Sequence, residues 1–101
     1  MNGKDVTMEN YGFIFNYLAF KKNRFYTEKE RKDIINKWAC EETKSIEQGK
    51  PTYAMIDLCK EFCNIADFQL YMDLPAFNPP IHSIDEMNYM LGKIIKFVKG
   101  R

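Results

Sequence analysis

Apolar and polar positions recur along this chain at the spacing of α-helices. The clearest case lies between residues 53 and 63, where one face is continuously apolar. Its members stand at i, i+1, i+4, i+7 and i+8: Met55, Ile56, Cys59, Phe62 and Cys63. Residues 84–99 repeat this pattern, and residues 28–48 carry apolar side chains on one side and charges on the other. Residues 65–74 are expected to form a short further helix that ends before Pro75, because proline disfavours helical geometry in the preceding residue.

Local capping sequences predict where three of these helices begin. Segments 27–30 and 83–86 both read Ser/Thr-x-x-Glu, the capping box in which a hydroxyl and a glutamate satisfy exposed backbone N–H groups. Thr52 is a third candidate N-cap. Gly49 is expected to end a helix in the left-handed conformation that glycine tolerates. The predicted helices are therefore 28–48, 53–63, 65–74 and 84–99.

Residues 11–20 form the most apolar segment of the chain. Eight of the ten are apolar or aromatic and none is charged. A helix is the preferred prediction, because its length suits one and Thr7 offers an N-cap before it. A strand is the alternative, since period two also gives two apolar faces and strand-favouring residues run throughout. Residues 1–6 are expected to form a flexible N-terminal tail.

These elements predict an all-α fold, a compact bundle of four to five short helices, with α+β as the alternative if residues 11–20 form a strand. The length of 101 residues suits one globular domain over residues 1–101, without a repeat or a long linker. The balance of 46% hydrophobic and 29% charged residues is typical of a globular chain rather than a disordered one. Gly92, inside a predicted helix, is expected to mark a close contact between helices.

The two flanks of a helix over residues 11–20 differ in what can cover them. The apolar stripes of the other helices can cover the flank that includes Tyr11, Phe15 and Leu18. The opposite flank, which has no obvious cover, consists of Phe13, Tyr17 and Phe20. Because exposed aromatic side chains commonly mark interfaces, these three are the predicted contacts with a partner.

Charge is segregated along the sequence although the net charge is only +1. Residues 21–40 carry seven basic and three acidic side chains, residues 93–101 add four basic ones, and residues 41–91 hold nine acids against three lysines. If the basic segments 21–32 and 93–101 converge, they would form a phosphate-binding patch with Phe25 and Tyr26 as stacking groups. Nucleic-acid binding is therefore the alternative function, through Lys21, Lys22, Arg24, Lys93 and Lys96.

No catalytic motif is present, and we expect neither an enzyme nor a cofactor. The one set with metal-ligating chemistry is Cys40, Cys59, Cys63 and His82. The spacing of these residues lacks the paired Cys-x-x-Cys pattern of zinc sites. Because two of the cysteines lie in an apolar stripe, the preferred interpretation is that they pack in the core. His82, the only histidine, has no nucleophile turn beside it and is interpreted as a loop residue.

The sequence favours a small helical protein–protein interaction module as the function. It would act as a regulator or inhibitor by occupying a partner surface or by self-association.

Charged residues on both sides of the apolar run argue against a signal peptide, and ten residues are too few to span a membrane. Three cysteines without an export signal indicate the cytoplasm. Twelve Lys against three Arg suggest an A/T-rich gene, which is compatible with a phage or mobile-element origin.

Overall fold

Five α-helices and no strand make up the part of the chain that the structure describes. The computed structural model describes residues 3–72 and 81–100. The helices in chain order are α1 (Gly3–Lys22), α2 (Glu28–Gln48), α3 (Tyr53–Cys63), α4 (Ala66–Tyr71) and α5 (Ile84–Lys99). The predicted all-α bundle is confirmed. The strand alternative for residues 11–20 is wrong, because these residues lie inside α1 and no strand occurs in the described ranges to pair with them.

Helix α2 begins and ends where its sequence predicts. The hydroxyl of Thr27 accepts a hydrogen bond from the Glu30 N–H at 3.1 Å, and the Glu30 carboxylate accepts one from the Thr27 N–H at 2.9 Å. Hydrogen bonding of the carboxylate, first to the Thr27 backbone N–H and then to the Thr27 side chain, lowers the pKa of the Glu30 carboxyl, because it favours the charged form. Gly49 ends the helix with a φ of 72°, which is the left-handed conformation.

The other predicted caps also form, with one difference. Thr52 accepts a hydrogen bond from the Met55 N–H at 3.5 Å and begins α3. Ser83 accepts one from the Glu86 N–H at 3.1 Å and begins α5. The Glu86 carboxylate, however, accepts its hydrogen bond from the N–H of His82, at 3.1 Å, rather than from that of Ser83. The second capping box therefore closes one residue earlier than the motif predicts.

Two helix boundaries differ from prediction. Helix α1 begins at Gly3, so Thr7 lies one turn inside it and the predicted Thr7 cap is wrong. No proline separates Gly3 from Met8, and an established helix gains one hydrogen bond for each residue it adds. The helix overlaps the predicted tail, of which residues 1–2 lie outside the described residues. Helix α4 spans Ala66–Tyr71, and residues 73–74 of the predicted 65–74 also lie outside them.

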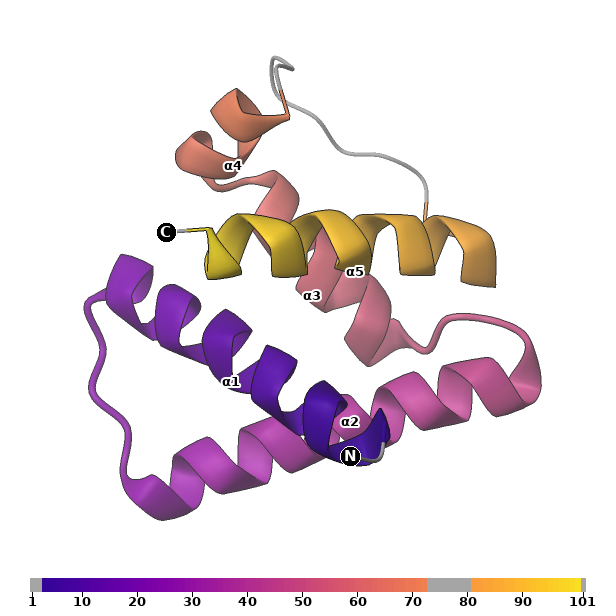
Figure 1. Cartoon of the computed structure of the whole chain (residues 1–101), viewed down its shortest axis with the longest axis horizontal. Helices are drawn as coiled ribbons and strands as arrows, with labels where there is room; N and C mark the ends of the chain where they lie inside the picture. Colours follow the sequence, from indigo (N-terminus) through magenta and orange to yellow (C-terminus); the bar gives the residue numbers. More distant parts are fainter. Residues whose placement is uncertain (1–2, 73–80, 101) are drawn as a thin grey trace.

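The helices pack around one core, and α1 lies between α2 and α5 (Figure 1). Helix α3 packs against both α2 and α5, and α4 covers the end of α3 and part of α5. All five helices and Ile81 contribute buried apolar side chains to one core. None of the helices in the described residues is long and apolar enough to cross a membrane.

Helices α2 and α3 are joined at a corner by Ser45, the one polar residue among the described side chains that is fully buried. Its hydroxyl donates to the Glu41 carbonyl at 2.8 Å and accepts from the Thr52 N–H at 3.0 Å. The last turn of α2 is thereby bonded to the N-cap of α3. Buried polar groups need such partners, since an unpaired one costs about 1–3 kcal/mol.

Gly92 does not mark a contact between helices, so that prediction is wrong. It lies on the exposed side of α5, and a Cβ added there would meet nothing within 4 Å. The packed side of α5 instead runs through its large apolar residues, Met87, Met90, Leu91, Ile94, Phe97 and Val98.

Candidate functional site

The three predicted interface residues have different surroundings. Phe13 is 40% exposed and Phe20 is 73% exposed, whereas Tyr17 is only 8% exposed. The Tyr17 ring stacks on Phe62 at 5.8 Å and meets Phe97 edge-on at 5.1 Å between ring centroids. The assignment of Tyr17 to an open surface is therefore wrong, because α5 covers this part of the flank.

The polar end of Tyr17 also has partners within the fold. Its hydroxyl donates to Oδ2 of Asp67 on α4 at 3.2 Å, and the same oxygen pairs with Lys21 Nζ at 3.0 Å. A tyrosine can be buried in this way when its hydroxyl reaches a hydrogen-bond partner. Tyr17 thus links α1 to α4 and α5 and belongs to the core.

The outward side of α1 is a line of four exposed residues, which we call the α1 face: Glu9, Phe13, Asn16 and Phe20. Their spacing of four, three and four residues keeps them on one side of the helix. Phe13 and Phe20 are seven residues apart, which is about 10 Å along the helix axis. Two large aromatic side chains are thereby held on one rigid, outward surface.

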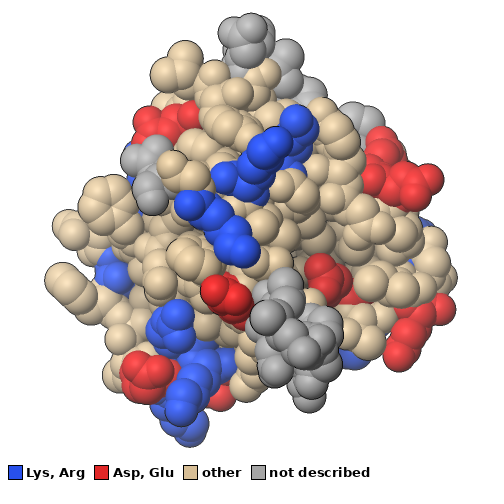
Figure 2. Space-filling view, viewed as in Figure 1, with Lys and Arg blue, Asp and Glu red and all other residues tan. Residues whose placement is uncertain are grey.

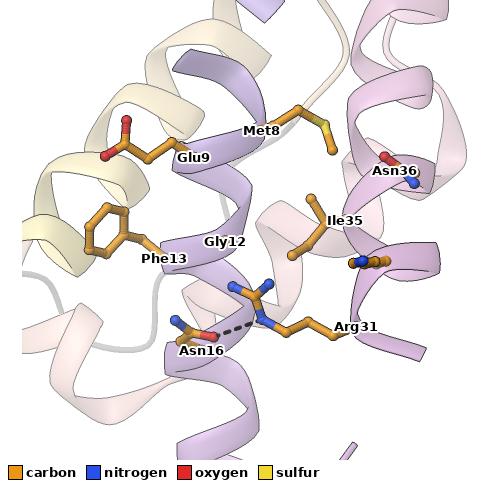
Figure 3. A pocket seen from close by; sticks show the side chains of 9 residues that line it. Met8, Glu9, Gly12, Phe13, Asn16, Arg31, Ile35 and Asn36 are labelled. Carbon is orange, nitrogen blue, oxygen red and sulfur yellow. Dashed lines mark hydrogen bonds between the residues drawn. The ribbon is translucent and has the colours of Figure 1, made fainter. Parts of the chain in front are cut away.

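A groove of about 580 Å³ runs beside the α1 face, between α1 and α2 (Figure 3). Met8, Phe13 and Ile35 supply its apolar surface. Its polar surface comes from side chains of both helices: Glu9, Asn16, Arg31, Lys32 and Asn36. The groove combines apolar contact area with a few hydrogen-bonding groups, which is the usual composition of a binding site.

Arg31 projects from α2 across the groove toward α1, and Figure 3 shows its guanidinium beside Gly12 and Asn16. Its Nε donates to Asn16 Oδ1 at 3.3 Å, and its Cζ lies 5.8 Å from the centre of the Phe15 ring. Within the described residues, no carboxylate forms an ion pair with Arg31. One of its five N–H donors is used in that hydrogen bond, and a planar guanidinium is suited to bind a carboxylate with two of the others.

Gly12 gives the Arg31 guanidinium room beside the backbone of α1. A Cβ at residue 12 would stand 3.2 Å from Nη2 of Arg31, which is tighter than ordinary van der Waals contact. Glycine in the interior of a helix costs about 0.5–1 kcal/mol relative to alanine. The sequence therefore carries a helix-weakening residue at the point where the guanidinium approaches the backbone of α1.

Positive charge borders the α1 face on two sides. Arg31 and Lys32 lie on the α2 side, and Lys99 Nζ from α5 lies 5.7 Å from the centre of the Phe13 ring. Glu9 is the acidic residue among those that line the groove. Figure 2 shows Lys and Arg side chains over α5 in the centre of the view and over the first half of α2 at the lower left, with acidic side chains along the right edge.

The five basic residues predicted to contact nucleic acid are engaged to different degrees. Lys21 pairs with Asp67 at 3.0 Å and Lys22 pairs with Glu61 at 2.7 Å. Arg24 lies over the Tyr26 ring at 4.7 Å, and that ring packs edge-on against Phe15. Two of the five charges are thus compensated by acids of α3 and α4, and Tyr26 is not a free stacking group.

The remaining two of the five predicted nucleic-acid contacts, Lys93 and Lys96, lie on α5. Lys93 Nζ is 5.6 Å from the centre of the Tyr89 ring, and Lys96 is exposed on the same helix. Phe25, the other predicted stacking group, is 94% exposed in the connection between α1 and α2.

The four candidate metal ligands are not brought together. Cys59 and Cys63 are buried in the core, whereas Cys40 and His82 are exposed, and the described residues contain no cluster of three or more His, Cys, Asp or Glu side chains that could hold a metal. Burial raises the pKa of the Cys59 thiol to about 12 and that of Cys63 to about 11. A thiol with so high a pKa is a poor nucleophile and packs as a small apolar group.

A second groove, of about 910 Å³, lies between the α2–α3 connection and residues 81–82. Tyr53, which is 87% exposed, stands at its edge, and Ile56 and Ile81 line it together with Lys50 and Lys60. The charged side chains of this groove, Lys50, Asp57 and Lys60, form no ion pair with another described residue, whereas Arg31 is hydrogen-bonded to Asn16 across the first groove. We therefore take the groove between α1 and α2 as the candidate site.

Sequence reasoning identified Phe13 and Phe20 but missed the α2 side of the site, Arg31 and Ile35. One signal was available, since Gly12 interrupts an otherwise bulky apolar run and glycine often marks a close approach. Comparisons of the chain with protein-family models, with curated proteins and with solved structures found no match.

Proposed function

We propose that this chain is a small helical protein-interaction module that binds another protein through the α1 face and the adjoining groove. It would act as a regulator or inhibitor by occupying a surface of that partner. The observation that carries the proposal is the pair Phe13 and Phe20, exposed on one side of a rigid helix beside an open groove. Large aromatic anchors of this kind supply much of the binding energy of protein interfaces.

The chemistry of the groove supports binding rather than catalysis. The residues that line it include no hydroxyl, thiol or imidazole that could serve as a nucleophile with its base. They do include apolar contacts and a bidentate donor, Arg31, which suit recognition of a peptide segment. The three cysteines are free thiols, which supports action in the cytoplasm.

The test is capture of a partner from the native host with the full chain as bait, followed by identification of the partner and a binding measurement with the purified pair. Phe13→Glu and Phe20→Glu should each abolish the interaction, because a charge replaces an apolar anchor. Tyr53→Glu is the control, since Tyr53 is also an exposed aromatic residue but lies at the second groove. All three variants should keep the circular dichroism spectrum of the wild type. Binding that survives both phenylalanine changes would overturn the proposal.

Nucleic-acid binding by α5 is a second candidate, favoured by the basic side chains over this helix in Figure 2; the basic residues of α5 are Lys93, Lys96 and Lys99. Lys93 and Lys96 would then neutralise phosphates, and the affinity would fall steeply with salt because bound counterions are released. Lys93→Gln with Lys96→Gln should flatten that salt dependence in a titration with labelled single-stranded DNA. An affinity that these changes leave intact would exclude this use of α5.

A further inference from the structure

Arg31 is a cation that the fold holds in place at the edge of a partly apolar groove. Asn16 accepts one of its hydrogen bonds, Gly12 leaves room for its guanidinium, and the Phe15 ring lies beneath it. In the described part of the chain it has no ion-pair partner. Because the side chain is half-buried and already ordered, little conformational entropy remains to be lost when it binds an anion.

The charges that border the α1 face argue against a second copy of this chain as the occupant. If two copies met with antiparallel α1 helices, the α2 sides of the two copies would face each other. Arg31 and Lys32 of one copy would then lie opposite Arg31 and Lys32 of the other. If the α1 helices were parallel, Arg31 and Lys32 would instead stand opposite Lys99 of the other copy. Both arrangements place like charges together, which disfavours association.

An acidic partner would be attracted by the same cations, and Glu9, the acidic residue among those that line the groove, projects from the side of α1 away from Arg31 (Figure 3). A carboxylate over the groove would meet the Arg31 guanidinium and lie near Lys32, while apolar side chains next to it would contact Met8, Ile35 and Phe13. A helix presents such a combination with its apolar and acidic residues one turn apart on one side. The groove, open between two helices, is bordered by the elongated α1 face along which such a helix can lie.

Building on the function proposed above, we infer that the groove between α1 and α2 receives an acidic amphipathic helix of the partner protein, with a carboxylate of that helix paired to Arg31. Phe13 and Phe20 then supply apolar contacts along the helix, and Arg31 selects for an acidic residue at one position. The partner class is thus a protein with an exposed helix that is apolar along one edge and acidic beside it.

A displayed library of helical peptides, each about 18 residues or five turns long, tests this inference against the full chain. Peptides selected on the wild type should be enriched in Asp or Glu one turn from a large apolar residue. Their affinity should fall about tenfold with Arg31→Gln and less with Arg31→Lys, which keeps the charge but loses the fork. Changing the selected acid to its amide should cause a similar loss, and the two losses should not add. Lys60→Gln, which removes an exposed cation from α3, is the matched control and should leave the affinity unchanged.

The possible outcomes separate this inference from the proposed function. The selected peptides could lose affinity with Phe13→Glu, keep it with Arg31→Gln and show no enrichment in Asp or Glu. That result would overturn the inference of an acidic partner helix but would leave the α1 face as a protein-binding surface. Peptides indifferent to both Phe13→Glu and Arg31→Gln, or a library without binders, would overturn the inference outright. Competition by a single-stranded oligothymidine for the same face, or an Arg31-dependent dimer in sedimentation experiments, would assign the groove to a different occupant and would also overturn it.

Discussion

Replacing Gly92 with alanine is expected to stabilise this protein. Gly92 lies in the interior of α5 on its exposed side, and a Cβ there would meet nothing within 4 Å. Alanine therefore adds no clash and removes no contact. It lowers the conformational entropy of the unfolded chain and restores a favourable helix former to an exposed turn.

The size of the effect follows from helix propensity. Glycine is about 0.8–1 kcal/mol less favourable than alanine in a helix interior, and measured gains from such replacements are about 0.4–1 kcal/mol. For a domain of this length, each kcal/mol shifts the melting temperature by about 4–8 °C. We therefore expect Gly92→Ala to raise the melting temperature by about 2–8 °C.

Gly12→Ala provides an internal comparison, because it makes the same chemical change in α1. Here the new Cβ would stand 3.2 Å from Nη2 of Arg31, so the guanidinium must shift and its 3.3 Å hydrogen bond to Asn16 weakens. Loss of one such bond costs about 0.5–1.5 kcal/mol, which offsets most or all of the propensity gain. Gly12→Ala should therefore gain clearly less stability than Gly92→Ala.

Thermal and urea unfolding, followed by far-ultraviolet circular dichroism, measure both variants on one scale. A lower melting temperature for Gly92→Ala would refute the open surroundings assigned to Gly92. Equal gains for the two variants would refute the close approach of Arg31 to the backbone of α1.

Three further predictions concern the core and its thiols. Tyr17→Phe should lower the free energy of unfolding in urea by about 0.5–1.5 kcal/mol, because the 3.2 Å hydrogen bond to Asp67 is lost. Tyr17→Glu should unfold the chain, whereas Phe20→Glu should not. A Tyr17→Glu variant that is folded by circular dichroism would contradict the burial of Tyr17. Burial raises the pKa of Cys59 to about 12 and of Cys63 to about 11 from an ordinary value of 9.0, so the unfolded state releases its protons first. The free energy of unfolding should accordingly be level below about pH 9 and fall toward pH 11, by up to about 1.4 kcal/mol per pH unit for each thiol. The fall in the urea midpoint should be smaller in a Cys59→Ala, Cys63→Ala variant. An identical pH profile in the variant and the wild type would show that other groups cause the pH dependence. Maleimide labelling of the native protein at neutral pH should stop at one thiol, Cys40, and reach all three in urea; labelling of two or three thiols in the folded protein would contradict the packing of α3.

Local sequence features predicted the helices well. Helices α2, α3 and α5 have the predicted bounds, because caps such as Thr27 and Gly49 act through hydrogen bonds within a few residues. The start of α1 was missed because Thr7 can serve either as a cap or as an interior helical residue, and its own sequence context does not decide between them.

The candidate site was predictable only in part, because it depends on contacts between distant segments. The exposure of Phe13 and Phe20 follows from the absence of a covering stripe, but the burial of Tyr17 depends on where Phe97 of α5 lies against α1. Likewise, the approach of Arg31 to α1 depends on the packing of α1 against α2. Helical periodicity describes each helix by itself and does not specify which flank a distant helix covers.

The packing of α5 against α1 has a consequence for how the chain folds during synthesis. These two helices are separated by some sixty residues that include α2, α3 and α4, yet the Tyr17 ring is enclosed only when Phe97 is in place. Contacts between such distant segments form slowly, because a long loop must close first. Until α5 is available, α1 exposes both the α1 face and the core side of Tyr17 to its surroundings. A chain that is still being made therefore carries more uncovered aromatic surface than the folded protein, and it is in this interval that the molecule is most open to aggregation or to chaperone binding.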